Sequence, residues 1–194
     1  MRAAAPSIEV LRAAARTPMA WKNGGGVTRE VAVSPTGSSL DDFDWRVSIA
    51  EIRVAGRFST FQGVDRRMAV LYGRLSFASD ARSPVILTPE SDALAFAGEL
   101  PVFTEPLGGP VTDLNVMTRR ACCSADLRRC GARAPVRLEA APGTTLLLVA
   151  LSEQLLQGAA GNVRLETLDA VRLAEGAITV EPPASFWAVR IQRL

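Results

Sequence analysis

The feature that most limits the folds open to this chain is an alternation of apolar and polar residues with a period of two. In FDWRVSIAEI, Trp45, Val47 and Ile49 alternate with Arg46 and Ser48. Successive side chains of a strand point to opposite faces, so the pattern predicts a strand. Similar segments recur along the chain, separated by Gly and Pro, which is typical of an all-β sandwich or barrel.

Most of the chain fits this description. The expected strands are residues 8–12, 27–33, 45–54, 67–72, 74–78, 84–88, 94–97, 113–118, 135–140, 145–151, 163–167, 177–180 and 186–192. Helix is expected only at EVLRAAAR (9–16) and SEQLLQG (152–158). The strand-turn rhythm occurs in both halves, so we expect two similar β halves packed as one unit. Pairing or closing the sheets would remove exposed strand edges.

The composition excludes several classes of function. The 194 residues include no histidine, which rules out Ser-His-Asp, Cys-His and His-ligated metal sites. The net charge of +2 is too small for a typical nucleic-acid-binding protein. Three cysteines without a C-x-x-C pair argue against a disulfide framework and fit a reducing compartment, so we expect a cytoplasmic protein.

No membrane role is expected from the sequence. The longest apolar run, LLLVAL at 146–151, is far shorter than the roughly 20 residues that cross a bilayer. The first residues lack the apolar segment of a signal peptide, and Glu9 interrupts them.

The stretch WKNGGGVTREV (21–31) places three glycines between an indole and a strand. A P-loop needs Lys after the glycines and a helix next, but here Lys22 precedes them and a strand follows. Two interpretations remain open: a turn that only glycine permits, or the rim of a binding site. For the second, Trp21, Lys22 and Asn23 would offer stacking, a cation and an amide, with Glu30 further along the strand.

A second stretch, GRFSTFQGVDRRMAVLYG (56–73), is similar to a strand-turn-strand of the cupin barrel. Against the usual cupin pattern, Arg66 stands where a metal-binding glutamate is expected, and Ser59 and Phe61 stand at the histidine positions. A guanidinium in place of a carboxylate would turn a cation site into an anion site. The alternative interpretation is that Arg66 or its neighbour Arg67 is a surface arginine, as most arginines are.

Two further strands carry candidate polar residues. Arg46 and Ser48 share one face of their strand, which is directed either at solvent or at a cavity. In DLNVMT, Asn115 is unusual because Asn is depleted in strands, and it shares a face with Asp113 and Met117. A buried Asn needs several hydrogen bonds, which a ligand or the backbone supplies.

Together, WKNGGGVTREV, FDWRVSIAEI, GRFSTFQGVDR, VLYG and DLNVMTRR resemble the HutD/Ves family of cupin-like bacterial proteins, over about residues 8–120. The resemblance implies a bicupin: residues 1–194 as one unit, with jelly-roll-like halves at about 8–120 and 121–194. It also implies no metal or other cofactor, a small anionic metabolite such as formylglutamate as ligand, and a modulating role in histidine utilisation or a related pathway. The HutD or Ves branch and the oligomeric state, a homodimer among the options, stay open.

The residues themselves support two main hypotheses. In the first, the chain is a metal-free binding protein for a small carboxylate. Its candidate ligand-binding residues are Trp21, Lys22, Asn23, Glu30, Arg46, Ser48, Ser59, Phe61, Arg66 and Asn115. In the second, it is a metal-independent isomerase or hydrolase of a small acid, with Glu30 or Glu51 as base. A protein-interaction module is a third option.

Overall fold

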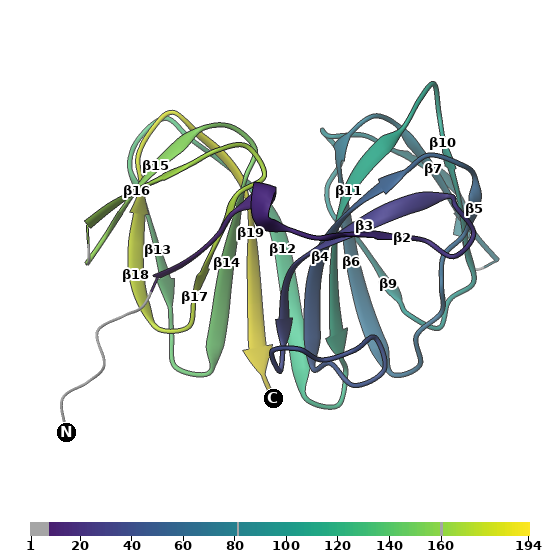
Figure 1. Cartoon of the computed structure of the whole chain (residues 1–194), viewed down its shortest axis with the longest axis horizontal. Coiled ribbons are helices and arrows are strands. Elements are labelled where there is room, and N and C mark those ends of the chain that lie inside the picture. The colour runs from purple at the N-terminus through teal and green to yellow at the C-terminus, as the bar shows by residue number, and fades with distance from the viewer. Residues whose placement is uncertain (1–7, 81, 160) are drawn as a thin grey trace. The chain divides into compact units, whose positions relative to one another are not determined.

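Short strands form almost all of the regular structure. The computed structural model describes residues 8–80, 82–159 and 161–194. It divides into two compact units: Arg16–Ser124, called here the N-terminal unit, and the described residues 8–15 together with Ala125–Leu194, called here the C-terminal unit. Each unit is built from two antiparallel sheets, which confirms the all-β prediction (Figure 1).

The N-terminal unit contains a six-stranded sheet in the order β2-β3-β4-β11-β6-β9 and a four-stranded sheet in the order β5-β10-β7-β8. The first comprises β2 (Pro18–Ala20), β3 (Gly26–Ser34), β4 (Trp45–Ile52), β6 (Val64–Tyr72), β9 (Leu94–Ala97) and β11 (Val111–Arg119). The second comprises β5 (Gly56–Arg57), β7 (Leu75–Ser79), β8 (Arg82–Leu87) and β10 (Val102–Pro106).

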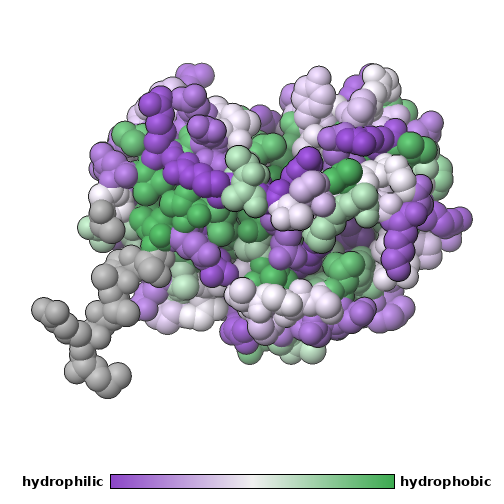
Figure 2. All heavy atoms as spheres, viewed as in Figure 1, coloured by the Kyte–Doolittle hydropathy of each residue, from purple (hydrophilic) through white to green (hydrophobic). Residues whose placement is uncertain are grey.

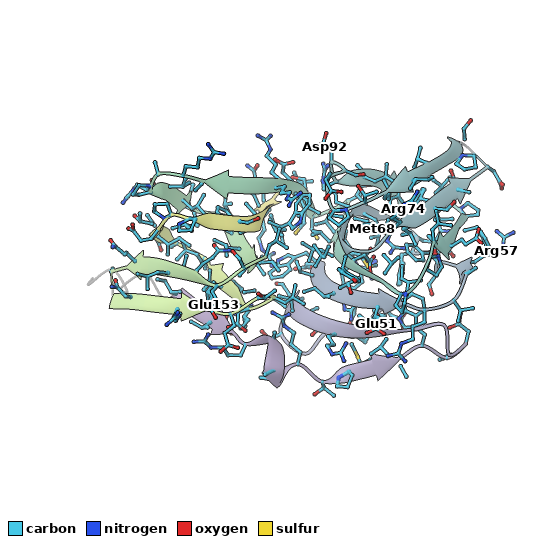
Figure 3. All side chains as sticks on the ribbon, turned by 90° about the horizontal axis from the view of Figure 1, so that it is seen from above. Glu51, Arg57, Met68, Arg74, Asp92 and Glu153 are labelled. Atoms are coloured by element: carbon cyan, nitrogen blue, oxygen red, sulfur yellow. The ribbon has the colours of Figure 1, made fainter. Side chains whose placement is uncertain are left out.

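The two sheets of this unit enclose an apolar cluster. Ile52, Met68 and Val111 come from the larger sheet, and Leu75 and Phe77 from the smaller one. Met68 is fully buried and lies inside the unit (Figure 3). A second, smaller cluster contains Val33, Phe43, Val64 and Met117. Burying apolar surface in this way is the main favourable term in folding.

The C-terminal unit repeats the two-sheet plan. One sheet has the order β1-β17-β14-β19-β12, and the other has the order β13-β18-β15-β16. The strands are β1 (Ile8–Leu11), β12 (Cys123–Ala132), β13 (Val136–Ala140), β14 (Thr144–Ala150), β15 (Gln154–Gly158), β16 (Gly161–Leu165), β17 (Ala170–Leu173), β18 (Gly176–Val180) and β19 (Ala184–Arg193). Both sheets contribute to one core, which includes Leu146, Leu148, Leu156, Ile178 and Phe186.

Both helical predictions are wrong. Residues 9–16 form strand β1 and a single 3-10 turn, η1 (Ala13–Ala15). Residues 152–158 contain strand β15, in which Gln154 and Leu156 are buried while Leu155 and Gln157 are exposed. This is the period of a strand, and it was hidden because Leu155 and Leu156 are adjacent apolar residues. Strands β2, β5, β10, β12, β15 and β17 were not predicted.

Candidate functional site

A pocket of about 660 Å³ opens in the N-terminal unit. Figure 2 shows the surface of this unit hollowed beneath strand β2, with both hydrophobic and hydrophilic side chains around the hollow. The inner wall consists of residues from β3, β4, β11 and β6. The rim comes from residues 19–23, 38–40 and 57–61. The mixture of aromatic and charged groups is typical of a small-molecule site.

Strand register explains why the polar residues of the inner wall meet. Arg46 on β4 pairs with Met117 on β11, which in turn pairs with Arg66 on β6. Two positions along, Ser48 pairs with Asn115. Because side chains alternate between the faces of a sheet, all five point to the same side, and all five line the pocket.

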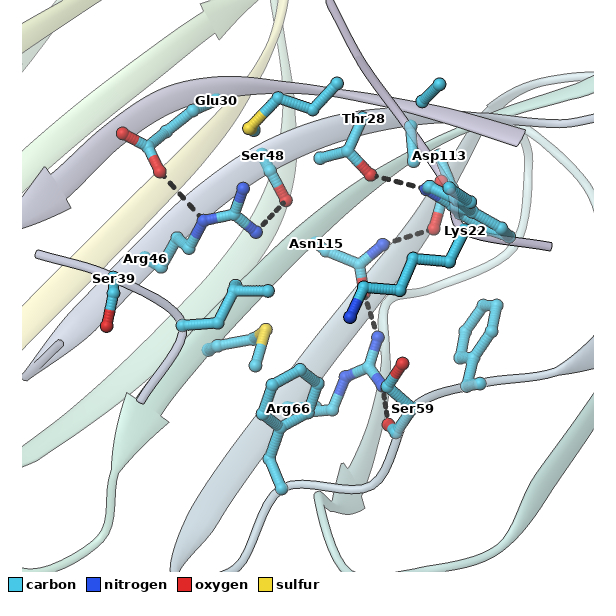
Figure 4. Close-up of a pocket in the computed structure, with 18 of the residues that line it drawn as sticks. Lys22, Thr28, Glu30, Ser39, Arg46, Ser48, Ser59, Arg66, Asp113 and Asn115 are labelled. Atoms are coloured by element: carbon cyan, nitrogen blue, oxygen red, sulfur yellow. Dashed lines mark hydrogen bonds and ion pairs between the residues drawn. The ribbon is translucent and has the colours of Figure 1, made fainter. Parts of the chain in front are cut away.

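A chain of polar contacts crosses the deepest part of this wall (Figure 4). Arg66 donates from Nη2 to Oδ1 of Asn115 over 2.8 Å. Asn115 donates from Nδ2 to Oδ2 of Asp113 in a short hydrogen bond. The amide therefore bridges a cation and an anion, with its oxygen toward the guanidinium and its nitrogen toward the carboxylate.

Two atoms at the ends of this chain have no hydrogen-bond partner. They are Nε of Arg66 and Oδ1 of Asp113, and both are buried. Arg66 is 7% exposed and Asp113 is fully buried. Buried polar groups are almost always hydrogen-bonded, so each orphaned atom calls for an explanation. Unsatisfied charged groups beside a pocket are typical of a site that a ligand completes.

Burial changes the acidity of both groups. Desolvation lowers the pKa of Arg66 to about 10, against the opposing attraction of Asp113. Desolvation also raises the pKa of Asp113 to about 7, although Arg66 and the Asn115 hydrogen bond pull it down. In both cases loss of water is the larger effect, as expected for ionisable groups inside a protein. Arg66 thus stays charged at neutral pH, while Asp113 titrates there.

Aromatic rings enclose the Arg66 guanidinium. Its central carbon lies 4.9 Å from the ring centre of Phe58, 5.0 Å from that of Phe96 and 5.9 Å from that of Phe61. Cation–π contacts of this kind contribute up to about 2 kcal/mol when desolvated. The rings fix the side chain, so a bound anion would meet an already ordered donor group.

The second buried guanidinium, that of Arg46, is already bonded to other side chains. Arg46 donates from Nε to Oε2 of Glu30 over 2.8 Å and makes a long contact from Nη1 to Ser48 Oγ at 3.5 Å. Glu30 lies on β3 directly before an irregularity in the β3–β4 register between Glu30 and Ala32. Arg46 is only 7% exposed, yet its charge is already paired.

The glycine-rich stretch forms part of the rim. Gly24 adopts a positive φ of 69° and donates to the carbonyl of Trp21. Gly26 begins β3, where a Cβ would lie 2.5 Å from the Glu51 carbonyl and 3.1 Å from the Trp21 ring. Gly24 therefore makes the turn, while Gly26 lets the indole pack over the start of the strand.

The rim residues around this turn are oriented by local hydrogen bonds. Trp21 donates from Nε1 to Thr28 Oγ1 over 2.8 Å and packs edge-on against Phe58. Asn23 accepts at Oδ1 from the backbone N–H of Gly25. Figure 4 shows Lys22 pointing into the pocket. Lys22 forms no ion pair within the part of the chain that the structure describes, so its charge is available to a ligand.

The structure brings all ten candidate ligand-binding residues to this one pocket. They are Trp21, Lys22, Asn23, Glu30, Arg46, Ser48, Ser59, Phe61, Arg66 and Asn115. Their role in binding stays a prediction. Glu51, the other candidate base, is not among the lining residues and pairs with Arg53. Arg66 and Arg46 both point into the pocket, so neither is a surface arginine.

Sequence reasoning missed several lining residues, above all Asp113 and Phe58. The alternation in DLNVMT places Asp113 on the same strand face as Asn115, and this shared face could have identified Asp113 as a lining residue. Phe58 lies one residue before Ser59 in a loop, where the period of two gives no guidance. Among the described residues, no group of three or more His, Cys, Asp or Glu side chains is arranged to hold a metal ion.

Comparison with known proteins decides the family. The family model HutD matches residues 13–187 of this chain. The chain belongs to the HutD family. The match extends well beyond the residues that carried the resemblance in the sequence.

Relatives of this HutD-family chain include an uncharacterised 21.2 kDa protein in the hutC 3′ region of Pseudomonas putida. It is 37% identical over 170 residues, which cover 86% of each chain. The protein Ves of Citrobacter koseri is 37% identical over 109 residues, or 56% of each chain.

Solved structures support the same assignment. HutD from Pseudomonas fluorescens SBW25, described for a formate condition, has a TM-score of 0.84 at 27% identity and covers 97% of this chain and 100% of its own. A cupin barrel domain protein from Leptotrichia buccalis has a TM-score of 0.58 at 10% identity, covering 91% and 92%, and shows the fold alone. The cupin-like fold of this HutD-family chain is therefore confirmed. No helix in the described residues is long and apolar enough to cross a membrane.

Proposed function

We propose that this HutD-family chain binds a small carboxylate metabolite in the pocket of its N-terminal unit, without a metal. The observation that carries the proposal is the buried, ring-enclosed guanidinium of Arg66, whose Nε has no protein partner. A guanidinium is well suited to recognise a carboxylate, because the two carboxylate oxygens accept two parallel hydrogen bonds.

The other residues of the pocket have compatible roles. Lys22 adds a second cation at the rim. Arg46 is a third cation, and its charge is paired with Glu30. Trp21 and Phe61 supply apolar walls, while Asn23 and Ser59 supply hydrogen-bonding groups for an amide or formyl substituent. The formate condition described for the Pseudomonas fluorescens HutD structure is consistent with an anion site, since formate is the smallest carboxylate.

The biological setting is part of the proposal. A Pseudomonas putida relative is described by its position in the hutC 3′ region, which points to histidine utilisation as the pathway. We infer that ligand binding reports the level of a pathway acid, with formylglutamate as the first candidate. The chain would then modulate the pathway by signalling that level to a partner.

Binding explains the pocket better than catalysis does. The two carboxylates that the sequence offers as bases are poorly placed for acid–base catalysis. Glu30 is held by Arg46, and Glu51 does not line the pocket. Incubating the protein with each pathway acid tests this directly, because turnover that is lost in Glu30→Gln would establish an enzyme instead.

Calorimetric titration with formylglutamate, urocanate and glutamate tests the binding proposal. At least one should bind, and Arg66→Met should weaken that binding roughly 10- to 100-fold, since a charge-assisted hydrogen bond contributes about 1.5–3 kcal/mol. Arg74→Met is the matched control, because Arg74 is an exposed arginine outside the pocket lining. Heats equal to dilution for all three acids would overturn the proposal.

A further inference from the structure

We propose that Asp113 takes up a proton when a carboxylate binds against Arg66, so that the pocket binds its anion together with a proton. The inference rests on the proposed function and concerns how that same site responds to pH. It starts from the carboxylate of Asp113, which is fully buried in the pocket wall and uses only one of its two oxygens.

The geometry ties Asp113 to the anion site. Asn115 joins it to Arg66 through two hydrogen bonds, so all three side chains lie in one row at the back of the pocket (Figure 4). In the free protein Arg66 is the buried cation that offsets the charge of Asp113. An anion bound to Arg66 would place a second negative charge within the same low-dielectric region.

The other charged residues around the pocket do not take over from Arg66 in balancing the charge of Asp113. On β4, Arg46 is paired with Glu30 of β3. Lys22 and Arg57 lie on the rim and are exposed, where water screens them. In the strand register, Glu51 on β4 lies opposite Thr112 of β11, and Arg67 on β6 lies opposite Val116 of β11. These positions are on the other face of the sheet from Asp113.

Protonating one of the two carboxylates is the least costly way to relieve the repulsion between Asp113 and the bound anion. Two like charges that share a buried site cannot both persist, and the weaker acid takes a proton. A small carboxylate has a pKa near 4, whereas Asp113 already titrates at about 7 in the free protein. The bound anion raises the pKa of Asp113 further, so Asp113 is the group that is neutralised.

The direction of the pH effect follows from proton linkage. Well below pH 7 Asp113 is already neutral in the free protein, so binding takes up almost no proton there. Above pH 7 the free protein is ionised at Asp113 and must gain a proton on binding. Affinity therefore falls as pH rises above 7, by at most about tenfold per pH unit, until Asp113 is also ionised in the complex.

N-formyl-L-glutamate is a suitable probe because neither its carboxyls nor its amide titrates between pH 6 and 8.5. Its binding is measured by calorimetry from pH 6 to 8.5, in Hepes and in Tris, whose ionisation enthalpies differ. The difference in heat gives the protons taken up. We expect close to none at pH 6, rising toward one per site at pH 8.

Asp113→Asn imitates the neutral form of the side chain and keeps an oxygen to accept from Asn115. Its affinity should not change between pH 6 and 8.5, and at pH 8.5 it should exceed that of the unmodified protein. Glu30→Gln is the matched control, because it neutralises the other carboxylate of the pocket. Whether or not the affinity of the Glu30→Gln variant changes, this variant should still take up a proton when the ligand binds at pH 8.

The possible failures are distinguishable. Binding without proton uptake by the unmodified protein overturns the Asp113 inference and leaves the binding proposal intact, and this measurement needs no variant to fold. The same conclusion follows if Asp113→Asn retains the original pH slope. A simple structural role for Asp113 predicts weaker binding at every pH. Absence of binding at all pH values overturns the proposed function itself.

Discussion

At the scale of single residues, the feature that defines the pocket is a guanidinium at a position where a carboxylate is expected. The resemblance to cupins places Arg66 where a metal-binding glutamate is expected, and the structure directs this guanidinium into the pocket. Its burial is made tolerable by three rings and by the Asn115–Asp113 pair. Arg66 and Asp113 are therefore energetically coupled, and changing either one alters the other.

Arg66→Met should lower the stability of the fold by about 3–5 kcal/mol at pH 8, because it removes the cation that offsets the buried carboxyl group of Asp113. Without Arg66 the pKa of Asp113 rises above 7. The folded state then holds a proton that the unfolded state releases above its pKa near 4, so stability falls with rising pH. Urea unfolding should show a smaller loss at pH 5 than at pH 8. Equal losses at both pH values would contradict this coupling.

Gly26→Ala tests the packing of the indole at the rim. The new methyl group would lie 2.5 Å from the Glu51 carbonyl, so β3 or β4 must shift and Trp21 with them. We expect a loss of roughly 1–3 kcal/mol in urea unfolding and weaker carboxylate binding. Gly56→Ala is the control, since a Cβ there has only Asn23 at 4.0 Å. Similar losses in both variants would show that steric contact at Gly26 is unimportant.

At the scale of elements, the loop at residues 58–63 forms one wall of the pocket and is held by a neighbouring turn. Phe61 donates its backbone N–H to the Gly98 carbonyl over 2.8 Å. Gly63 donates to Oε1 of Glu99 over 2.6 Å. Gly98 has no room for a Cβ, which would lie 2.6 Å from the Phe61 carbonyl. The position of the aromatic wall thus depends on residues outside the pocket.

Glu99→Gln should loosen this loop in a pH-dependent way. The hydrogen bond from Arg120 is the largest of several effects that lower the pKa of Glu99 to about 2. A lowered pKa stabilises the fold above the unfolded value near 4.5, and the contribution is lost as pH falls through 2. The variant should therefore be less stable at pH 7, with the difference shrinking toward pH 2. A constant difference across thermal melts from pH 2 to 7 would disprove this.

At the scale of the whole molecule, the two units have the same two-sheet plan. Every residue that lines the pocket belongs to the N-terminal unit. The two sheets of the C-terminal unit share a core of Leu, Ile, Val, Ala and Phe side chains. Each unit thus has an apolar core of its own, and the proposed binding site belongs to the N-terminal unit.

Leu148→Ala separates stability from binding. Leu148 is fully buried in the core of the C-terminal unit, and its truncation should cost about 2–5 kcal/mol in urea unfolding. Carboxylate affinity measured under native conditions should stay within twofold of the unmodified protein. Affinity that falls together with stability would show that the C-terminal unit supports the site.

The sequence predicted the fold class and most strands, because alternation is a local signal. It was weakest for very short strands such as β2 and β5, and where neighbouring residues are both apolar, as with Leu155 and Leu156 of β15. Strand β12 (Cys123–Ala132) was missed because polar and apolar residues do not alternate cleanly in CSADLRRCGA. A strand of that kind is recognised only when its pairing partner is known.

The candidate site was predicted residue by residue, yet its organisation was not. Arg46 and Ser48 were named because they share one face of a strand, and Asn115 because Asn is depleted in strands. That Asn115 joins Arg66 to Asp113 depends on the register of β11 and β6, and Arg66 lies 49 residues from Asn115 in the sequence. No local pattern carries that information.

The position of Trp21 gives the molecule a built-in optical reporter. The chain has three tryptophans, and Trp45 and Trp187 are only 4% and 1% exposed, whereas Trp21 lies half-buried at the pocket rim. Its indole emission is therefore the component that solvent quenchers reach. An occupied pocket would shield this fluorophore and shift its spectrum to the blue, while the two core tryptophans would supply an unchanging internal standard.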